Sequence, residues 1–313
     1  MGAGQAGADF LLIVNPASQN GRTGRRWREV EGVLTAAGLK FETAMTSRPL
    51  EATEIARREV KAGRPAVVAV GGDGTLNEVV NGFFEGGEPI PGQTRLGLLP
   101  IGTGADTRKT LGIPVDLEAA ARVLIQARTR RLDAGRCRCA APGGGQVVRH
   151  FINIADAGFG GDVVDRSNRG SKALGGGVTY MLASLVTLAR WKNKPMTIQV
   201  DGKRRQLVAL MVAVANCQYF GGGMWVAPGA KPDDGLFDVI LVGDLGPVET
   251  LRGLTQIRAG THLQGNPKIQ LLHGKHVVVE SPQPVRVETD GELPGILPAT
   301  FEIQPGAIEV LTP

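Results

Sequence analysis

A buried strand, a glycine-rich turn and a helix follow one another in residues 66–84, which read AVVAVGGDGTLNEVVNGFF. The continuous apolar run at 66–70 predicts a strand that is covered on both faces, as in parallel sheets. Gly71-Gly72-Asp73-Gly74 predicts a tight turn, and residues 75–84 predict a helix. Ligands of open α/β sheets bind beyond the carboxyl ends of strands, and a helix N-terminus attracts anions. The turn is therefore a candidate phosphate site.

The same alternation extends outward from this stretch over about 130 residues and predicts a doubly wound α/β domain. Further strands are expected at 10–15, 40–46 and 95–100, and further helices at 22–37, 50–62 and 116–127. The pattern then changes to short strands separated by turns such as Asp201-Gly202, which predicts a mostly antiparallel β domain. The strands expected there are 130–139, 147–155, 196–201, 206–215, 236–242, 276–280, 284–290 and 300–311, with helical inserts at 173–191 and 247–260. We place the α/β domain at 1–132 and the β domain at 133–295, with the tail 296–313 packing back on the first domain.

Composition narrows the function classes. The chain has 313 residues, of which 42% are hydrophobic, so it can bury real cores. Its 45 glycines follow no collagen period, and its net charge of +5 suits an anionic partner. Only 4% of residues are aromatic, and no recognition motif is present, so we expect no nucleic acid as partner.

Cysteine usage and hydropathy indicate a cytoplasmic protein. Cys137, Cys139 and Cys217 form no CxxC pair, which favours a reducing compartment and argues against a structural zinc. The longest uncharged apolar run, 173–189, is shorter than the ~20 residues of a membrane span. Basic residues flank it between Lys172 and Lys194, so we weigh transient contact with an anionic membrane surface against an internal helix with a solvated end.

Other phosphate and metal motifs are missing or misplaced. No GxxxxGK[ST] is present, and the GxGxxG of Gly2, Gly4 and Gly7 precedes the first strand, where a dinucleotide site needs it to follow one. His273 and His276 have no supporting ligand pattern.

Six motifs in order along the chain resemble the soluble lipid kinases of the diacylglycerol kinase catalytic-domain type, a group that includes bacterial diacylglycerol, sphingosine and ceramide kinases. They are IVNPAS (13–18), VVAVGGDGTLNEVVNGF (67–83), GLLPIGTGADTRKTLGIP (97–114), NIADAGFGGDVV (153–164), APGAKPDDGLFDVILV (227–242) and TDGELPG (289–295). The resemblance implies an α/β domain like that of NAD kinases and phosphofructokinases, a β-sandwich domain, and ATP in the cleft between them. It implies transfer of the γ-phosphoryl group to a lipid hydroxyl, with diacylglycerol as the default acceptor and phosphatidic acid as product. It also suggests a homodimer and a cytoplasmic enzyme that is peripheral to the membrane.

The resemblance also assigns site residues. Those implied to bind the nucleotide are Asn15, Thr46, Gly72, Asp73, Gly74, Thr75, Leu76, Asn77, Glu78 and Thr103. A structural Mg²⁺ is implied at Asp234 and the carbonyls of Lys231 and Leu236, which are the hard oxygen ligands that this ion prefers. From spacing alone, Asp234-Gly235 fits a plain hairpin turn equally well.

Asp290-Gly291-Glu292 resembles the family's catalytic carboxylate loop. A hydroxyl nucleophile needs a nearby base, and either Glu292 or Asp290 would serve. Alternation along a strand would put both on one face. We expect Asp73 to assist by holding a catalytic Mg²⁺ through water.

The chain departs from the family pattern at Ala105 and Thr107, where an asparagine and an aromatic residue are usual. This leaves the acceptor open among diacylglycerol, a sphingoid base, ceramide or another lipid alcohol. A member that binds nucleotide or lipid without transfer, and an NAD kinase, are the competing interpretations.

Overall fold

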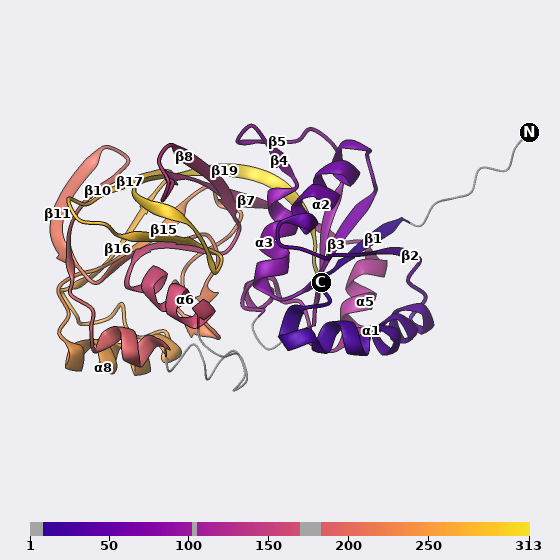
Figure 1. Ribbon diagram of the computed structural model, residues 1–313, viewed down its shortest axis with the longest axis horizontal. Helices are drawn as coiled ribbons and strands as arrows, with labels where there is room; N and C mark the ends of the chain where they lie inside the picture. The colour runs from indigo at the N-terminus through magenta and orange to yellow at the C-terminus, as the bar shows by residue number, and fades with distance from the viewer. Residues whose placement is uncertain (1–8, 102–104, 170–182) are drawn as a thin grey trace, which may run out of the picture. The chain divides into compact units, whose positions relative to one another are not determined.

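The computed structural model describes residues 9–101, 105–169 and 183–313 (Figure 1). Within them the chain forms two compact units. Unit 1 takes the described residues of Met1–Gly102, with Leu111–Arg131 and Ile308–Pro313, and unit 2 takes those of Thr103–Thr110 and Leu132–Ala307. No helix in the described ranges is long and apolar enough to cross a bilayer.

Unit 1 is built on a parallel sheet with the strand order β6-β3-β1-β2. Its strands are β1 (Phe10–Val14), β2 (Phe41–Met45), β3 (Ala66–Gly71) and β6 (Arg95–Pro100). Every side chain of β1 and β3 is buried, which is why both strands have continuous apolar sequences. Beyond β6 the sheet gains Val310 from the last strand of the chain, which lies beside Leu96 in parallel register.

Helices cover both faces of this sheet (Figure 1): α1 (Ser18–Ala36), α2 (Glu51–Lys61), α3 (Asp73–Asn81) and α5 (Leu117–Gln126). Trp27, Val30 and Leu34 of α1 pack with apolar residues of α5 against β1 and β3 in one core cluster. The element α1 starts at Ser18, but Gln19, Asn20 and Gly21 have left-handed backbone, so its regular right-handed part begins at Arg22, as expected. The helix expected at 75–84 spans Asp73–Asn81, so the glycine turn is shorter than expected. A small hairpin, β4 (Phe84–Glu85) and β5 (Glu88–Pro89), follows it.

Unit 2 is a β-sandwich whose described strands are mostly antiparallel. One layer has the order β16-β15-β12-β9-β18, and the other contains β11-β10-β17-β19 with β7 and β8 beside β19. The bounds are β7 (Thr129–Ala140), β8 (Gln146–Phe151), β9 (Ile154–Gly158), β10 (Lys194–Val200), β11 (Lys203–Ala209), β12 (Met211–Ala215), β15 (Phe237–Val242), β16 (Ile269–Gly274), β17 (His276–Glu280), β18 (Arg286–Thr289) and β19 (Glu292–Leu311). These two layers confirm the expected fold class.

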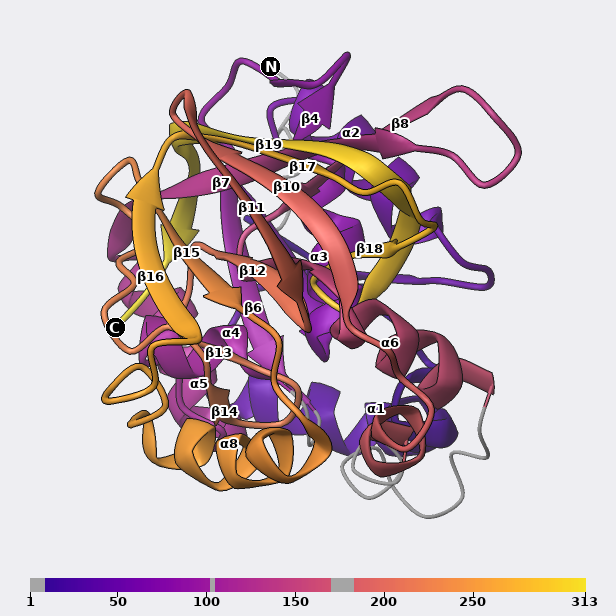
Figure 2. The same cartoon turned by 90° about the vertical axis from the view of Figure 1, so that its left-hand side faces the viewer.

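The alternation of β12 explains its two environments. Val212 and Val214 point into the sandwich core, where Phe151 stacks on Phe237 with ring centroids 5.7 Å apart. Ala213 and Ala215 point to the other side, into a second cluster that contains residues of α6 (Phe159–Arg169). Figure 2 shows α6 and α8 (Pro247–Ala259) lying outside the strands, where small residues leave room for helices.

Several expected elements have different bounds. The run 147–155 divides into β8 and β9, and 206–215 divides into β11 and β12. α6 and β16 were not predicted, and α4 (Thr107–Leu111) and the β13–β14 hairpin (Tyr219–Phe220, Met224–Trp225) are short additions. Of the helical insert expected at 173–191, residues 183–188 are helical and 173–182 lie outside the described residues.

Candidate active site

The carboxyl ends of four parallel strands meet at one edge of unit 1. Val14 of β1 pairs with Met45 and Val70, and Gly71 pairs with Pro100. The chain therefore leaves the sheet at a common level at Asn15, Thr46 and Gly72. Asn15 Oδ1 accepts the Ala17 N–H at 3.0 Å, and the Thr46 N–H bonds the Val14 carbonyl at 2.9 Å. Thr103, the fourth residue expected here, lies outside the described residues.

The glycine turn has two different glycines. A Cβ on Gly71 would lie 2.5 Å from Thr75 Oγ1, so only glycine allows Thr75 to pack against β3. A Cβ on Gly72 would meet nothing within 4 Å. Gly72 is the N-cap residue of α3, and no side chain at this position accepts a hydrogen bond from the first amides of the helix. Among the described residues, space is therefore left beside Gly72, at the end of α3 that carries its first amides and the positive end of the helix dipole.

The residues after Asp73 divide by burial. Asp73 and Gly74 are partly exposed in the first turn of α3, whereas Thr75, Leu76 and Asn77 are buried. The Asn81 amide donates to the Asn77 carbonyl at 2.9 Å, and Thr53 donates to the carbonyl of Glu78 at 2.7 Å. The structure thus places Thr75, Leu76, Asn77 and Glu78 in the packing of α3, and leaves Gly72, Asp73 and Gly74 accessible to a ligand.

In unit 2, Asp290 and Gly291 are the two central residues of the β18–β19 turn, with φ of 49° and 90°. Thr289 pairs with Glu292 across this turn. The two carboxylates therefore do not alternate along one strand, and that expectation is wrong because left-handed backbone separates them. Asp290 is 7% exposed and accepts the N–H groups of Ile152, Asn153 and Ile154, each at 3.1 Å. Glu292 is exposed at the start of β19.

These contacts give the two acids different abilities. The carboxylate of Asp290 is engaged by three buried amides, so it fixes the position of the turn. The carboxylate of Glu292 is open to solvent and to a substrate, as a proton acceptor must be.

Two further acids that sequence reasoning missed lie beneath the turn. Asp156 of β9 and Glu288 of β18 are directly opposite each other and are 0% and 1% exposed. Burial raises the pKa of Asp156 to about 7, and burial together with the charge of Asp156 raises the pKa of Glu288. Glu288 accepts the N–H of Gly291, so this pair supports the turn that carries Glu292. Their signal in the sequence is a carboxylate in place of an apolar residue within a buried strand.

The turn at Asp234 carries the residues expected to hold a structural cation. Asp234 Oδ1 accepts the Leu236 N–H at 3.1 Å, and Asp133, which is 2% exposed, accepts the N–H of Gly235 at 2.7 Å. The pKa of Asp133 is raised mainly by burial and further by the charges of Asp234 and Asp233. In the described ranges no three His, Cys, Asp or Glu side chains gather as a metal cluster. The carboxylates of Asp133, Asp233 and Asp234 nevertheless lie near this turn, and their oxygens are of the hard type that Mg²⁺ prefers.

The two departures from the family pattern are buried. Ala105 and Thr107 are 5% and 1% exposed. Between them, Asp106 accepts the Gly222 N–H at 2.7 Å and pairs with Lys109 at 2.9 Å. Asp106 therefore links this segment to the β13–β14 hairpin of unit 2 by a hydrogen bond, a role that the sequence did not indicate.

An almost wholly apolar pocket of about 80 Å³ lies under α8 in unit 2. Among the described residues, the one titratable side chain that lines it is His262, which is 3% exposed and whose Nε2 hydrogen-bonds to the Val226 carbonyl at 2.9 Å. Burial lowers the pKa of His262, which favours the neutral imidazole. The pocket is lined by Phe159, Gly160, Ser184, Leu210, Met211, Phe220, Met224, Val242, Leu245, Thr250, Gly253, Leu254, Ile257, His262 and Ile269. It contains no charged carboxylate, ammonium or guanidinium group, so it suits hydrocarbon.

Two family models match the chain in succession. The diacylglycerol kinase catalytic domain matches residues 9–137, and the YegS C-terminal NAD kinase beta sandwich-like domain matches residues 153–312. The diacylglycerol kinase of Staphylococcus haemolyticus is 31% identical over 302 residues, which cover 96% of this chain and 87% of that protein. The diacylglycerol kinase of Staphylococcus saprophyticus is 30% identical and covers 96% and 94%.

Solved structures share the fold. A diacylglycerol kinase structure from Bacillus anthracis has a TM-score of 0.69 at 23% identity, covering 97% of this chain and 96% of that one. Yeast NADH kinase complexed with NADH has a TM-score of 0.51 at 13% identity, covering 99% and 84%. At these identities the likeness shows the architecture alone.

Proposed function

The chain belongs to the diacylglycerol kinase family of lipid kinases, and from this premise we propose that it transfers the γ-phosphoryl group of ATP to the hydroxyl of diacylglycerol, giving phosphatidic acid. The observation that carries the acceptor assignment is the identity of 30–31% over 96% of the chain to two diacylglycerol kinases. The apolar pocket under α8, at about 80 Å³, has room for only a short part of a hydrocarbon chain.

Unit 1 supports the donor half of the reaction. The open N-terminus of α3 presents main-chain amides from Gly72 onward, and phosphate groups bind such helix ends. Asn15 and Thr46 leave the sheet at the same level, so their polar groups belong to the same donor surface. The remaining residues that the resemblance assigns to the nucleotide support this surface through the packing of α3.

Unit 2 supports the acceptor half. In the proposed step the acceptor oxygen bonds to the γ-phosphorus, the bond from that phosphorus to the β–γ bridging oxygen breaks, and ADP leaves. Glu292 takes the hydroxyl proton, since its carboxylate is accessible, and Asp290 holds the turn in place. This assigns the base role to Glu292 and a positioning role to Asp290.

Mg²⁺ fits the family's chemistry at two places in this chain. A bound ion would neutralise charge on the phosphates, and Asp73, partly exposed at the start of α3, is the carboxylate that would hold it through water. The acidic turn of Asp234, with the carbonyls of Lys231 and Leu236, would hold a second, structural ion.

The test is transfer of labelled phosphate from ATP to lipid in mixed micelles. Diacylglycerol, sphingosine and ceramide are presented in parallel, and the product is identified by chromatography. We expect phosphatidic acid as the main product. A preference for sphingosine or ceramide would replace diacylglycerol as the acceptor, and ATP binding with no transfer to any lipid would overturn the proposed activity.

Variants separate the roles. Glu292→Gln and Asp73→Asn should each lower kcat by about 10²-fold or more, the usual contribution of a positioned proton acceptor or metal-bound charge. Glu280→Gln removes an exposed carboxylate of β17 in unit 2 and is the matched control. Undiminished transfer by Glu292→Gln or by Asp73→Asn would remove that residue from the mechanism.

We also propose that the protein reaches its acceptor by transient contact with a membrane surface. Val248 and Leu251 of α8 are 82% and 52% exposed, and Leu185 and Val186 are each 43% exposed. Such apolar side chains insert weakly at a lipid interface. Vesicle sedimentation with wild type and Val248→Ser/Leu251→Ser should show reduced binding by the variant, and equal binding would exclude this face.

A further inference from the structure

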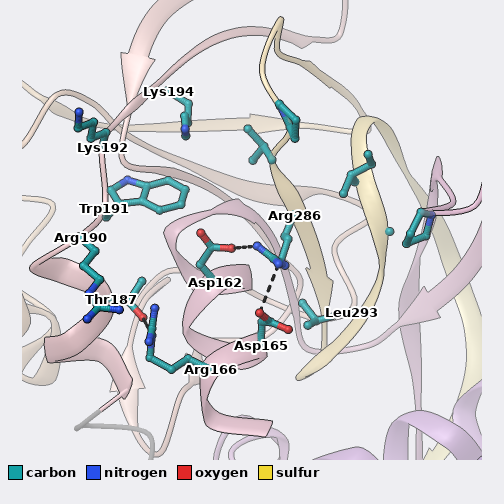
Figure 3. Close-up of a pocket in the computed structure, with 15 residues that line it drawn as sticks. Asp162, Asp165, Arg166, Thr187, Arg190, Trp191, Lys192, Lys194, Arg286 and Leu293 are labelled. Carbon is teal, nitrogen blue, oxygen red and sulfur yellow. Dashed lines mark hydrogen bonds and ion pairs between the residues drawn. The ribbon is translucent and has the colours of Figure 1, made fainter. Parts of the chain in front are cut away.

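A cavity of about 570 Å³ lies beside α6 in unit 2, and the proposed function gives it no role. Figure 3 shows charged side chains converging on it from α6, from the segment that follows residue 187 and from β18. Its lining consists of Pro142, Asp162, Asp165, Arg166, Thr187, Arg190, Trp191, Lys192, Lys194, Pro284, Val285, Arg286, Leu293, Gly295 and Ile296. A volume of this size is typical of sites for small organic ligands.

The charge of this cavity is strongly unbalanced. Five lining side chains are cationic and two are carboxylates, which leaves a net charge of +3. Both carboxylates are already used, because Arg286 contacts Asp162 and lies 3.3 Å from Asp165 (Figure 3). A metal cation is therefore disfavoured, and the positive excess comes from the other four side chains, Arg166, Arg190, Lys192 and Lys194.

Two of these four cations are held in place by neighbours. Arg166 donates through Nε to Thr187 Oγ1 at 3.1 Å, a bond that occupies only one edge of its guanidinium. The Lys194 ammonium lies 5.8 Å from the centre of the Trp191 ring and donates to Gln283 at 3.0 Å. Donors that are already oriented lose less conformational entropy when a ligand binds.

The other two cations are open to solvent. Arg190 and Lys192 are exposed, and neither has a carboxylate partner within the described part of the chain. The planar guanidinium of arginine can donate two hydrogen bonds to one phosphate, and the ammonium of lysine adds a compact positive charge. The two side chains together therefore suit a phosphate group.

From this arrangement we propose that the cavity in unit 2 is a binding site for a phosphate monoester. A dianion balances the excess positive charge better than a carboxylate or a phosphodiester, which each carry one charge. The volume leaves room for an organic group beside the phosphate, against the Trp191 ring and the apolar edge formed by Val285 and Leu293.

The shared chemistry has two sources, a soluble ester or a lipid headgroup, and the experiment separates them. The full-length protein without nucleotide is titrated with glycerol 3-phosphate by calorimetry, and with phosphatidylcholine vesicles that contain phosphatidic acid by sedimentation. Vesicles with phosphatidylglycerol at equal surface charge report simple attraction to a charged surface. The assay contains no ATP and measures no transfer. Because phosphatidic acid is also the product of the proposed reaction, its binding is assigned to this cavity only where Arg166→Gln/Arg190→Gln weakens it and Glu292→Gln does not.

We expect saturable binding of at least one phosphomonoester probe. Arg166→Gln/Arg190→Gln should weaken it at least tenfold, which corresponds to about 1.4 kcal/mol. Lys203→Gln/Arg204→Gln removes two exposed cations from β11 and should leave it unchanged. Binding should also fall below about pH 6, where a phosphate monoester loses its second charge.

The outcomes decide the proposal. Binding of the soluble probe alone, of the lipid probe alone or of both supports the site and names its source. Absence of saturable binding to either probe overturns it. Equal losses in the two double variants, or equal binding to phosphatidylglycerol and phosphatidic acid, also overturn it, since they would show only general attraction to positive charge.

Discussion

Replacing Asp156 with asparagine should make unit 2 more stable at alkaline pH than the wild type. Asp156 and Glu288 face each other in a buried part of the sandwich, under the turn that carries Glu292. Burial raises the pKa of Asp156 from 3.8 to about 7, so the folded protein keeps a proton there that the unfolded chain releases near pH 4. The stabilisation of the folded state by this retained proton is therefore fully present below about pH 4, and it is lost as the pH rises toward 7.

The magnitude follows from the shift. About three pKa units at 1.36 kcal/mol per unit give about 4 kcal/mol over the whole window. About 3 kcal/mol of it falls between pH 5 and pH 8. Asparagine removes the ionisation, and its amide oxygen can accept the hydrogen bond that protonated Glu288 donates to Asp156. We expect the variant to exceed wild type by about 1 kcal/mol at pH 5 and by about 4 kcal/mol at pH 8, so its advantage grows by about 3 kcal/mol.

The assay is urea unfolding at pH 5 and pH 8, followed by tryptophan fluorescence in a Trp27→Phe background. Trp27 belongs to unit 1, so the remaining signal comes from Trp191 and Trp225 of unit 2. Comparing wild type with variant at each pH cancels the titration of groups that do not interact with Asp156; Glu288, whose pKa the charge of Asp156 raises, changes with it, so the difference reports the pair. Glu280→Gln, which removes an exposed carboxylate of the same unit, should show no such pH-dependent difference. A difference between wild type and Asp156→Asn that is the same at both pH values would refute the reasoning.

Three further predictions concern the turn and pocket residues. Gly71→Ala would place a Cβ 2.5 Å from Thr75 Oγ1, so we expect the protein to lose about 1–3 kcal/mol of stability and to bind ATP more weakly. Thermal unfolding with and without nucleotide measures both effects. Unchanged ATP binding would contradict the role given to the turn. Asp290→Ala leaves three buried amides without their acceptor and should lower the stability of the protein by about 3 kcal/mol or more. Glu292→Gln should instead lower kcat and leave the melting temperature unchanged. The reverse pattern would exchange the roles of the two residues. Gly253→Leu adds a side chain to the apolar pocket and should raise KM for long-chain more than for short-chain diacylglycerol at similar stability; an equal effect on both would place the hydrocarbon elsewhere.

The sequence predicted the architecture of unit 1 well because its strands are buried on both faces. Residues 66–71 contain no polar side chain, and the strand that they form differs by one residue from the expectation. The glycine turn and its helix were found for the same reason. The helix was expected from residue 22, after a turn at Gln19-Asn20-Gly21; Asn-Gly favours left-handed backbone, whereas the positive φ of Gln19 has no signal in residue type.

Unit 2 was harder to predict because its strands are short and its contacts are distant in the chain. α6 begins with Phe159-Gly160-Gly161, which resembles a turn. Gly160 is explained only in three dimensions, since a Cβ there would lie 2.1 Å from the buried carboxylate of Asp156. The roles of Asp290 and Glu292 were likewise open, because the amides that hold Asp290 come from residues 152–154, more than a hundred positions earlier. No local pattern carries that information.

The last strand has a consequence for how the protein is made. β19 begins at Glu292 in unit 2 and ends at Leu311, and its final residues complete unit 1 by placing Val310 next to Leu96 and burying Leu311 among α1, α5 and β3. An N-terminal fragment ending near residue 131 would lack both, so its β6 would be left as an unprotected edge. During synthesis, residues 9–131 therefore leave the ribosome well before residues 308–311, which their sheet needs in order to be finished.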